Sequence, residues 1–307
     1  MTVKIFILIL FFTFPLVAIC QKDLTLNVEA RPAKIESSLN QTSGLIYWRD
    51  LYWVHVDKDK PTLYGLDDAG KVKMKVNLAG VGQEDWEDIA QDEEYIYLGD
   101  IGTNHRKGRF TIYQIKKTLI KTVDSQQIDS NQIVHIKYRM DGKGYDPEVV
   151  KKEENKYDCE AMVVYDKKIH LFTKGWAQET IDHYVIELPE KTETGKTIKL
   201  DATFRESIEK GNLLITGADI DITGNLVLLG YEETDSAVRD KSLVKLMYFQ
   251  RGFDSLKKVK PIKYILDTKE GYKQMEAICF KRPGLLYLAN DNEDTSQSSG
   301  LYHVRFP

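Results

Sequence analysis

Apolar and polar positions follow one layout that recurs five times along the chain. Each copy opens with small or acidic residues, runs through an apolar stretch, turns at polar residues and continues in a second, richer apolar stretch. The copies are TSGLIYWRDLYWVHVD from Thr42, WEDIAQDEEYIYLGDIG from Trp86, CEAMVVYDKKIHLFTKG from Cys159, GADIDITGNLVLLGYEE from Gly217 and MEAICFKRPGLLYLANDN from Met275. Alternation with β-branched and aromatic enrichment is typical of strands, so each copy predicts a hairpin.

Further strand patterns follow each hairpin. A third apolar run lies at 62–67, 110–115, 183–189, 243–250 and 300–306, and a fourth lies at 71–78, 132–140, 197–204 and 260–267. Four short antiparallel strands repeated around an axis form a β-propeller blade. The fifth unit ends after its third strand, and the segment 24–33 is expected to supply the fourth and so leave no open edge.

The fold prediction is therefore all-β, a five-bladed β-propeller closed by an N-terminal strand. One alternative is a six-bladed ring with a blade hidden in the long insert of the second unit. The other is a pair of stacked β-sandwiches.

The N-terminus has the pattern of an export signal. Lys4 precedes an apolar run over 5–19 that Pro15 interrupts, and this run is short for a membrane span of roughly 20 residues. We expect residues 1–20 to be a signal peptide cleaved before Gln21 and residues 21–307 to form a single propeller domain. The expected location is secreted or periplasmic, without stable membrane insertion. A lipid anchor through Cys20 is the alternative, although Ile19 before it is large for such a signal.

Composition limits the partners and the crosslinks. The chain is 42% hydrophobic and 29% charged with a net charge of -4, which is ordinary for a globular protein and shows no basic face for nucleic acid. We expect a monomer that binds a small molecule or a glycan. After the export signal two cysteines remain, Cys159 and Cys279, and the sequence leaves open whether they pair.

Acidic residues recur at one position of the repeat. When the units are aligned on their first apolar residue, the residues two places earlier are Ser43, Glu87, Glu160, Ala218 and Glu276. The innermost strands of a propeller line its central channel, so these positions should form a ring. Like charges about 4 Å apart repel by several kcal/mol at intermediate dielectric, and calcium, which takes 6–8 oxygen ligands, relieves that repulsion. We predict a calcium site there, with Ala218 contributing its carbonyl; pairing with Lys or Arg, or solvated strand ends, is the alternative.

A second polar register follows where the second strand of each unit ends. It comprises Asp57, Asp100, Lys174, Tyr231 and Asn290, with Asn104, Arg106, Trp176 and Asp291 nearby. Loops at one face of a rigid scaffold commonly carry function. We assign Asp100 as catalytic base and Lys174 and Arg106 as holders of an anionic group. The expected substrate contacts are Asp57, Asn104, Trp176, Tyr231, Asn290 and Asp291. This ring is expected to be separate from the first, at an undetermined channel end, and Asp85 is expected to be a solvated turn residue.

The motifs WEDIA, YLGDIGTN, DCEAM, LFTKGW and QMEAI resemble those of a group of exported bacterial propeller proteins over residues 43–292. A more distant similarity is to the calcium-activated nucleotidases (apyrases), five-bladed propellers that hold one calcium in the channel. Their inner-strand pattern of Ser, Glu, Glu, Ser and Glu matches Ser43, Glu87, Glu160 and Glu276 and departs at Ala218. The resemblance implies a calcium site.

Two functions from different classes remain. The first is a calcium-dependent hydrolase of an anionic substrate, of phosphoester or lactone type. The second is a non-catalytic secreted binding or scaffold propeller in which calcium is structural.

Overall fold

The computed structural model describes residues 23–28, 32–56, 60–103, 110–140, 156–176, 178–232, 243–251, 253, 255–268, 274–291 and 299–305. The expected signal peptide 1–20, Asp57, Asn104 and Arg106 lie outside these ranges. The helices of the described ranges are short 3-10 turns at Ser37–Leu39, Lys117–Leu119, Ser130–Gln132 and Leu256–Lys258. None of the described helices has the length and apolar content that crossing a bilayer requires.

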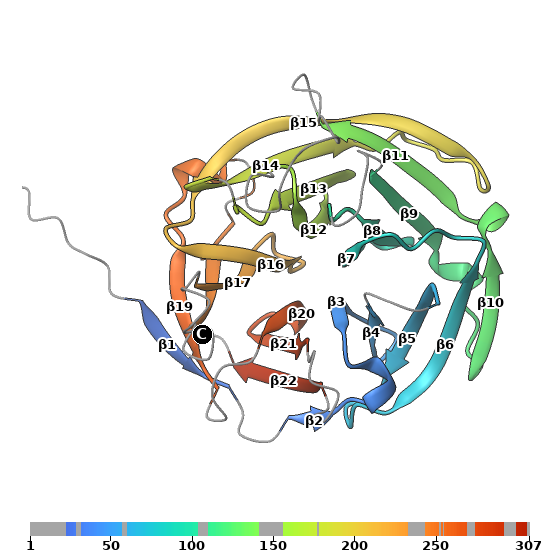
Figure 1. Ribbon diagram of the computed structural model, residues 1–307, viewed down its shortest axis with the longest axis horizontal. Helices are drawn as coiled ribbons and strands as arrows, with labels where there is room; N and C mark the ends of the chain where they lie inside the picture. The colour runs from blue at the N-terminus through green and yellow to red at the C-terminus, as the bar shows by residue number, and fades with distance from the viewer. Residues whose placement is uncertain are drawn as a thin grey trace, which may run out of the picture.

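Twenty of the 22 described strands form five groups of four antiparallel strands, and β1 and β10 are added at outer edges (Figure 1). Group 1 contains β3 (Thr42–Trp48), β4 (Leu51–Val56), β5 (Thr62–Leu66) and β6 (Val72–Ala79). Group 2 contains β7 (Trp86–Gln91), β8 (Tyr95–Asp100), β9 (Phe110–Lys116) and β11 (Val134–Met140). Group 3 contains β12 (Cys159–Tyr165), β13 (Lys168–Thr173), β14 (Thr180–Glu187) and β15 (Thr197–Glu209). Group 4 contains β16 (Leu213–Ile220), β17 (Leu226–Glu232), β18 (Val244–Phe249) and β19 (Ile262–Asp267). Group 5 contains β20 (Met275–Arg282), β21 (Leu285–Asn290), β22 (Gly300–Arg305) and β2 (Ala33–Lys34).

The first strands of the groups form a closed ring around a central axis. In sequence order β3 contacts β7, β7 contacts β12, β12 contacts β16 and β16 contacts β20, and β20 returns to β3. The remaining strands of each group follow outward from the axis (Figure 1). This arrangement confirms the predicted all-β propeller architecture.

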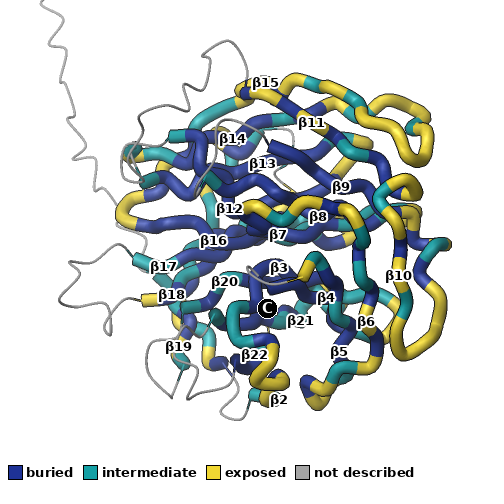
Figure 2. Tube along the Cα trace, turned by 45° about the vertical axis from the view of Figure 1, so that its right-hand side comes forward, coloured by how far each residue is buried: buried dark blue, intermediate teal, exposed yellow. Residues whose placement is uncertain are grey.

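The hydrophobic core lies between the groups. The described residues form five apolar clusters, and each is shared by two neighbouring groups, including groups 5 and 1. For example, Trp53 of β4 and Trp86 of β7 are both fully buried in one cluster. Figure 2 shows the inner strands β7, β12 and β16 almost wholly buried, and exposed residues at the periphery. Each group therefore depends on both neighbours for burial of its two faces.

The outer edges of the groups pair in ways that the repeat pattern does not show. β11 and β15 run parallel and join groups 2 and 3 into one sheet. The insert after β9 supplies β10 (Ser125–Asp129), which adds in parallel to β6 of group 1. Among the described residues the insert after β9 therefore contributes one edge strand. The six-bladed alternative required it to contain a whole blade.

The closing strand also differs from the expected 24–33. Ala33 and Lys34 form β2 and pair with β22 of group 5, while β1 (Leu24–Asn27) runs parallel to β19 of group 4. The N-terminal segment is thus divided between two outer strands, because each of them offers an unpaired edge.

The two described cysteines do not pair. Cys159 lies on β12 and Cys279 on β20, and both are fully buried free thiols. Burial raises the pKa of both thiols well above the ordinary value, which makes them unreactive. The interfaces between the groups, rather than a bridge between these cysteines, stabilise the fold.

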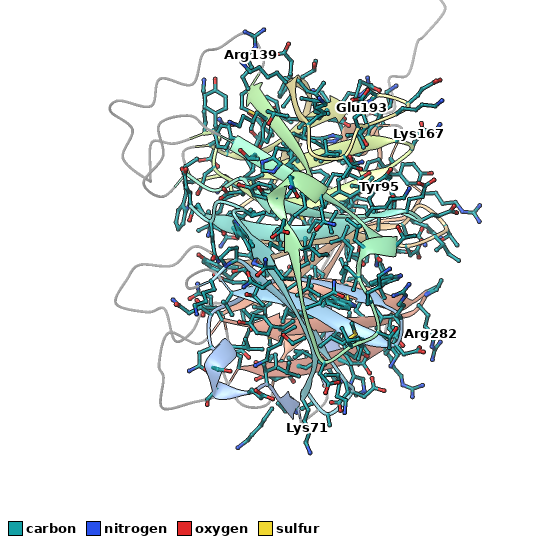
Figure 3. The ribbon with its side chains drawn as sticks, turned by 90° about the vertical axis from the view of Figure 1, so that its right-hand side faces the viewer. Lys71, Tyr95, Arg139, Lys167, Glu193 and Arg282 are labelled. Carbon is teal, nitrogen blue, oxygen red and sulfur yellow. The ribbon has the colours of Figure 1, made fainter. Side chains whose placement is uncertain are left out.

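The turns between the first and second strands lie at one end of the axis. Tyr95, Lys167 and Arg282, from groups 2, 3 and 5, all lie on the right-hand side of the edge-on view in Figure 3. In group 3 the turn consists of Asp166 and Lys167, both with positive φ, between the paired residues Tyr165 and Lys168. Two central residues with positive φ define the tight hairpin turn that suits strand twist.

Candidate functional site

Both expected polar rings lie at the opposite end of the axis, where the inner strands begin. Each inner strand pairs antiparallel with the second strand of its group, so the start of one lies beside the end of the other. Trp86 pairs with Asp100, and Met275 pairs with Asn290. The two rings predicted as separate therefore lie side by side at one end of the axis.

A β-bulge opens every inner strand and decides which residue belongs to the first ring. The first register shift in each strand leaves one residue without a partner, and these residues are Gly44, Glu87, Glu160, Thr216 and Glu276. Bulges re-aim side chains at strand ends. Glu87, Glu160 and Glu276 thus share a position as predicted. Ser43 and Ala218 do not, because alignment on the first apolar residue is one residue out in β3 and two out in β16.

Gly44 and Thr216, which occupy the bulge position in β3 and β16, cannot act as the glutamates do. Gly44 has φ +65°, and a Cβ there would lie 2.6 Å from Nε2 of His55, so no side chain fits. The Thr216 hydroxyl donates to the Met275 carbonyl at 2.8 Å and joins groups 4 and 5. The fourth group therefore has a hydroxyl at this position, but its proton is used in a hydrogen bond to a backbone carbonyl.

Lys174 pairs with the ring of glutamates. Its Nζ lies 2.7 Å from Oε1 of Glu160, and both side chains are almost completely buried. The ammonium also lies 5.1 Å from the ring centroid of Trp176 and 6.0 Å from that of Tyr231. Burial opposes the charge, but Glu160, Tyr231, Glu276 and Asp158 outweigh it and hold the pKa of Lys174 well above its ordinary value.

The carboxyl groups around Lys174 are held close together. Burial, and then the charges of Glu160, Asp85 and Asp158, raise the pKa of Glu87 well above the ordinary value. Burial also raises the pKa of Glu160 to about 7, against the lowering effect of Lys174. A Cβ on Gly102 would lie 2.1 Å from Oε1 of Glu87 and 2.4 Å from Oδ2 of Asp85. These two carboxylates therefore converge on the space beside Gly102.

Asp85 and Asp158 also belong to the buried carboxyl groups around Lys174, although neither was predicted as a site residue. Asp85 is 4% exposed and Asp158 is 2% exposed, so the expectation that Asp85 is a solvated turn residue is wrong. Asp158 accepts from the Thr103 amide at 3.1 Å, the Thr103 hydroxyl at 2.7 Å and Nε1 of Trp176 at 3.0 Å. The signal was present in the sequence, because Asp-x-Glu occurs both at 85–87 and at 158–160. We call Asp85, Glu87, Asp158, Glu160, Lys174 and Glu276 the axial cluster.

Other predicted site residues have structural partners. Asp100 is buried, and its Oδ1 accepts from the Asp85 amide at 2.8 Å, so it positions the start of β7. Oδ1 of Asn290 accepts from the Gly300 amide at 2.7 Å, and the Asp291 amide donates to the Gln274 carbonyl at 2.8 Å. Trp176 and Tyr231 are half-buried beside Lys174.

The donor set matches a hard cation in kind, because the axial cluster offers carboxylate oxygens and no sulfur or imidazole. Among the described residues, however, no three acidic, His or Cys side chains are arranged around one metal position. The physical reason is that Glu160 pairs with Lys174, and Oε1 of Glu276 accepts from Nε2 of Gln274 at 2.5 Å. The pair that converges beside Gly102, Asp85 and Glu87, is the part that fits an ion with water and carbonyl ligands.

Comparison with known proteins gives a fold likeness only. No family model matches the chain, and no curated protein matches it. A glucose dehydrogenase structure has 11% identity and TM-score 0.46, covering 90% of this chain and all of its own. A DUF4221 family member from Bacteroides vulgatus has 9% identity and TM-score 0.43, covering 93% of this chain and 99% of its own. A streptogramin B lyase has 11% identity and TM-score 0.42, covering 90% and 97%. These values bear on no activity, and the nucleotidase resemblance stays a prediction.

Proposed function

We propose that the axial cluster binds a hard divalent cation, with calcium as the first candidate, beside a small anionic ligand that the protein hydrolyses. The excess of carboxyl groups over ammonium groups in the axial cluster supports cation binding most directly. Five carboxyl groups, those of Asp85, Glu87, Asp158, Glu160 and Glu276, lie around the ammonium of Lys174. Buried carboxylates in excess must take up protons or a cation.

Asp85 and Glu87 would hold the ion, since their oxygens converge beside Gly102. This location differs from the predicted symmetric ring, because Lys174 already neutralises Glu160. Bound calcium would supply a Lewis acid that polarises a phosphoryl or carbonyl oxygen of the ligand.

The residues of the chain supply the remaining parts of the site. Glu160, with a pKa of about 7, is suited to take up and return a proton near neutral pH. Because Lys174 is already paired with Glu160, the bound cation would supply the positive charge that an anionic ligand needs. Trp176 and Tyr231 lie next to Lys174. Asp100, predicted as the base, is a positioning residue in this proposal because it holds the Asp85 backbone.

Calcium uptake tests the cation part. Isothermal titration of the purified, chelator-treated protein at neutral pH should give one calcium per chain. Glu87→Gln should weaken binding at least tenfold, whereas the exposed Glu187→Gln, on β14, should leave it unchanged. A wild-type protein that takes up no calcium would remove the proposal.

A structural ion in a binding protein is the second candidate. The observation in its favour is that Asp158 links β12 to Thr103 and Trp176, so the cluster also joins groups 2 and 3. A panel of phosphoesters and lactones separates the two. Calcium-dependent turnover that Glu160→Gln abolishes, at temperatures where the fold persists, supports the hydrolase. A lower melting temperature without turnover supports the structural ion.

Export is also part of this proposal. We propose that residues 1–20 are removed during secretion, as their pattern of Lys4 and a short apolar run indicates. Intact mass of the protein recovered from an exporting host should correspond to a chain beginning at Gln21. A mass that retains residues 1–20 would contradict it.

A further inference from the structure

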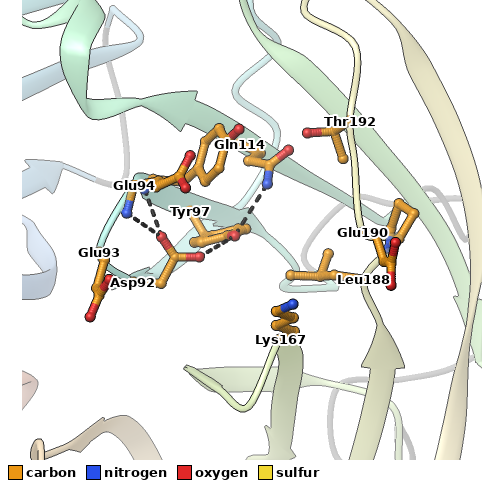
Figure 4. A pocket seen from close by; sticks show the side chains of 11 residues that line it. Asp92, Glu93, Glu94, Tyr97, Gln114, Lys167, Leu188, Glu190 and Thr192 are labelled. Carbon is orange, nitrogen blue, oxygen red and sulfur yellow. Dashed lines mark hydrogen bonds between the residues drawn. The ribbon is translucent and has the colours of Figure 1, made fainter.

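A pocket lies at the far end of the molecule, between groups 2 and 3. Its volume is about 290 Å³. The turn between β7 and β8, Tyr97 of β8, Gln114 of β9, the turn residue Lys167 and the segment after β14 line it (Figure 4). The axial cluster lies at the other end of β7 and β12, so this pocket is independent of the proposed function.

Gln114 presents an unsatisfied acceptor to this pocket. The side chain is 4% exposed, and its Nε2 donates to the Tyr97 hydroxyl at 3.2 Å. That hydroxyl donates in turn to Oδ2 of Asp92 at 2.7 Å. Because the tyrosine proton is used on Asp92, the tyrosine oxygen must accept, and this orients the Gln114 amide.

Oε1 of Gln114 is left without a hydrogen-bond partner in the part of the chain that the structure describes. Figure 4 shows it directed toward the Thr192 side of the pocket, while Nε2 faces Tyr97. A buried acceptor without a partner is costly. The atom therefore calls for an N–H or O–H donor from a bound molecule.

Lys167 presents the complementary group. Its backbone has φ +57° in the turn between β12 and β13, and Figure 4 shows its ammonium directed into the space between Tyr97 and Leu188. Within the described ranges no carboxylate lies within ion-pair distance of it, whereas the neighbouring Lys168 pairs with Glu187 at 3.0 Å. An anionic group of a ligand would find a free cation here.

Acidic residues around the pocket indicate which kind of hydrogen-bond donor a ligand would present to Oε1 of Gln114. Glu93, Glu94 and Glu190 line the pocket together with Asp92. Four acidic residues against Lys167 favour a positively charged donor over a neutral hydroxyl. The ligand should therefore carry both an ammonium and an anionic group.

We propose that this pocket binds a small zwitterion of the α-amino acid type, with its carboxylate on Lys167 and its ammonium on Oε1 of Gln114. Tyr97 and Leu188 supply the walls, as is usual for small-ligand pockets with a few placed polar groups.

Titration calorimetry with L-serine on the full chain tests the assignment. We expect saturable binding that Lys167→Met and Gln114→Leu each weaken at least tenfold. Lys167 is exposed, so its variant keeps the test informative even where Gln114→Leu fails to fold. The matched control is Lys71→Met, an exposed lysine after the turn between β5 and β6, which should bind L-serine as the wild type does.

Two analogues test the two halves of the zwitterion. L-Lactate lacks the ammonium and n-butylammonium lacks the carboxylate, and each should bind at least tenfold more weakly than L-serine. Equal binding of either analogue would overturn the assignment. Absence of L-serine binding, or binding that Lys167→Met leaves unchanged, would overturn it as well.

Discussion

At the scale of single residues, two lysines on the same hairpin show how burial changes the contribution of an ion pair to the free energy of unfolding. Lys174 and Glu160 are buried and 2.7 Å apart, whereas Lys168 and Glu187 are 3.0 Å apart with side chains 36% and 73% exposed. Removing one partner of a buried pair leaves the other charge uncompensated. Solvent screens the exposed pair.

We expect Lys174→Met to lower the free energy of unfolding by about 3–5 kcal/mol. Lys168→Met, the matched control, should change it by about 0–1 kcal/mol. Denaturant unfolding of the two variants and the wild type at neutral pH measures both. Similar losses in the two variants would contradict the expectation that burial makes the Lys174–Glu160 pair the more costly one to break.

At the scale of elements, single carboxyl groups join neighbouring inner strands. Asp88 of β7 is 1% exposed, and its Oδ2 accepts from the Met162 amide of β12 at 2.7 Å. Asp219 of β16 accepts from the Phe280 amide of β20 at 2.7 Å. Burial raises the pKa of Asp219 to about 7, so the link between β16 and β20 depends on pH.

Stability should fall as pH rises through the window set by Asp219. The folded chain keeps this proton up to about pH 7, whereas the unfolded chain loses it near 3.9. Since the folded state binds more protons between these values, unfolding free energy decreases across the window and levels off above it. Asp219→Asn should reduce this slope in denaturant unfolding between pH 4 and pH 8, while the exposed Asp50→Asn should not. An unchanged slope in Asp219→Asn would contradict the assignment.

At the scale of the whole molecule, each apolar cluster belongs to two groups and the ring closes between groups 5 and 1. No described group has a core of its own, so the loss of one group exposes an apolar face on both neighbours. Local opening is then coupled around the ring.

We therefore expect one cooperative thermal transition in differential scanning calorimetry, with calorimetric and van't Hoff enthalpies in agreement. Ala substitution of the fully buried Leu39, which packs between groups 5 and 1, should shift that transition downward without splitting it. Two separated transitions would show that some groups unfold independently.

Part of the axial cluster was accessible from the sequence, and the reason is the repeat. Glu87, Glu160 and Glu276 share one bulge because each follows the same pattern before its apolar run. Ser43 and Ala218 were misaligned because the first apolar residue stands at different distances from the bulge: Leu45 directly follows Gly44, whereas Ile220 lies four residues after Thr216. Asp85 and Asp158 were missed because burial at a strand start depends on neighbouring groups.

The sequence alone determined the repeated strands of the five groups and the recurring acidic position, because these follow from local alternation and turn chemistry. Only the tertiary structure showed that both polar rings lie at one end of the axis, and that Lys174 pairs with Glu160 there. It also divided the N-terminal segment between β19 and β22 and formed the pocket of Gln114 and Lys167. The physical reason is common to these features. Each brings together residues from different groups or distant segments, and their proximity is set by packing around the axis rather than by any pattern along the chain.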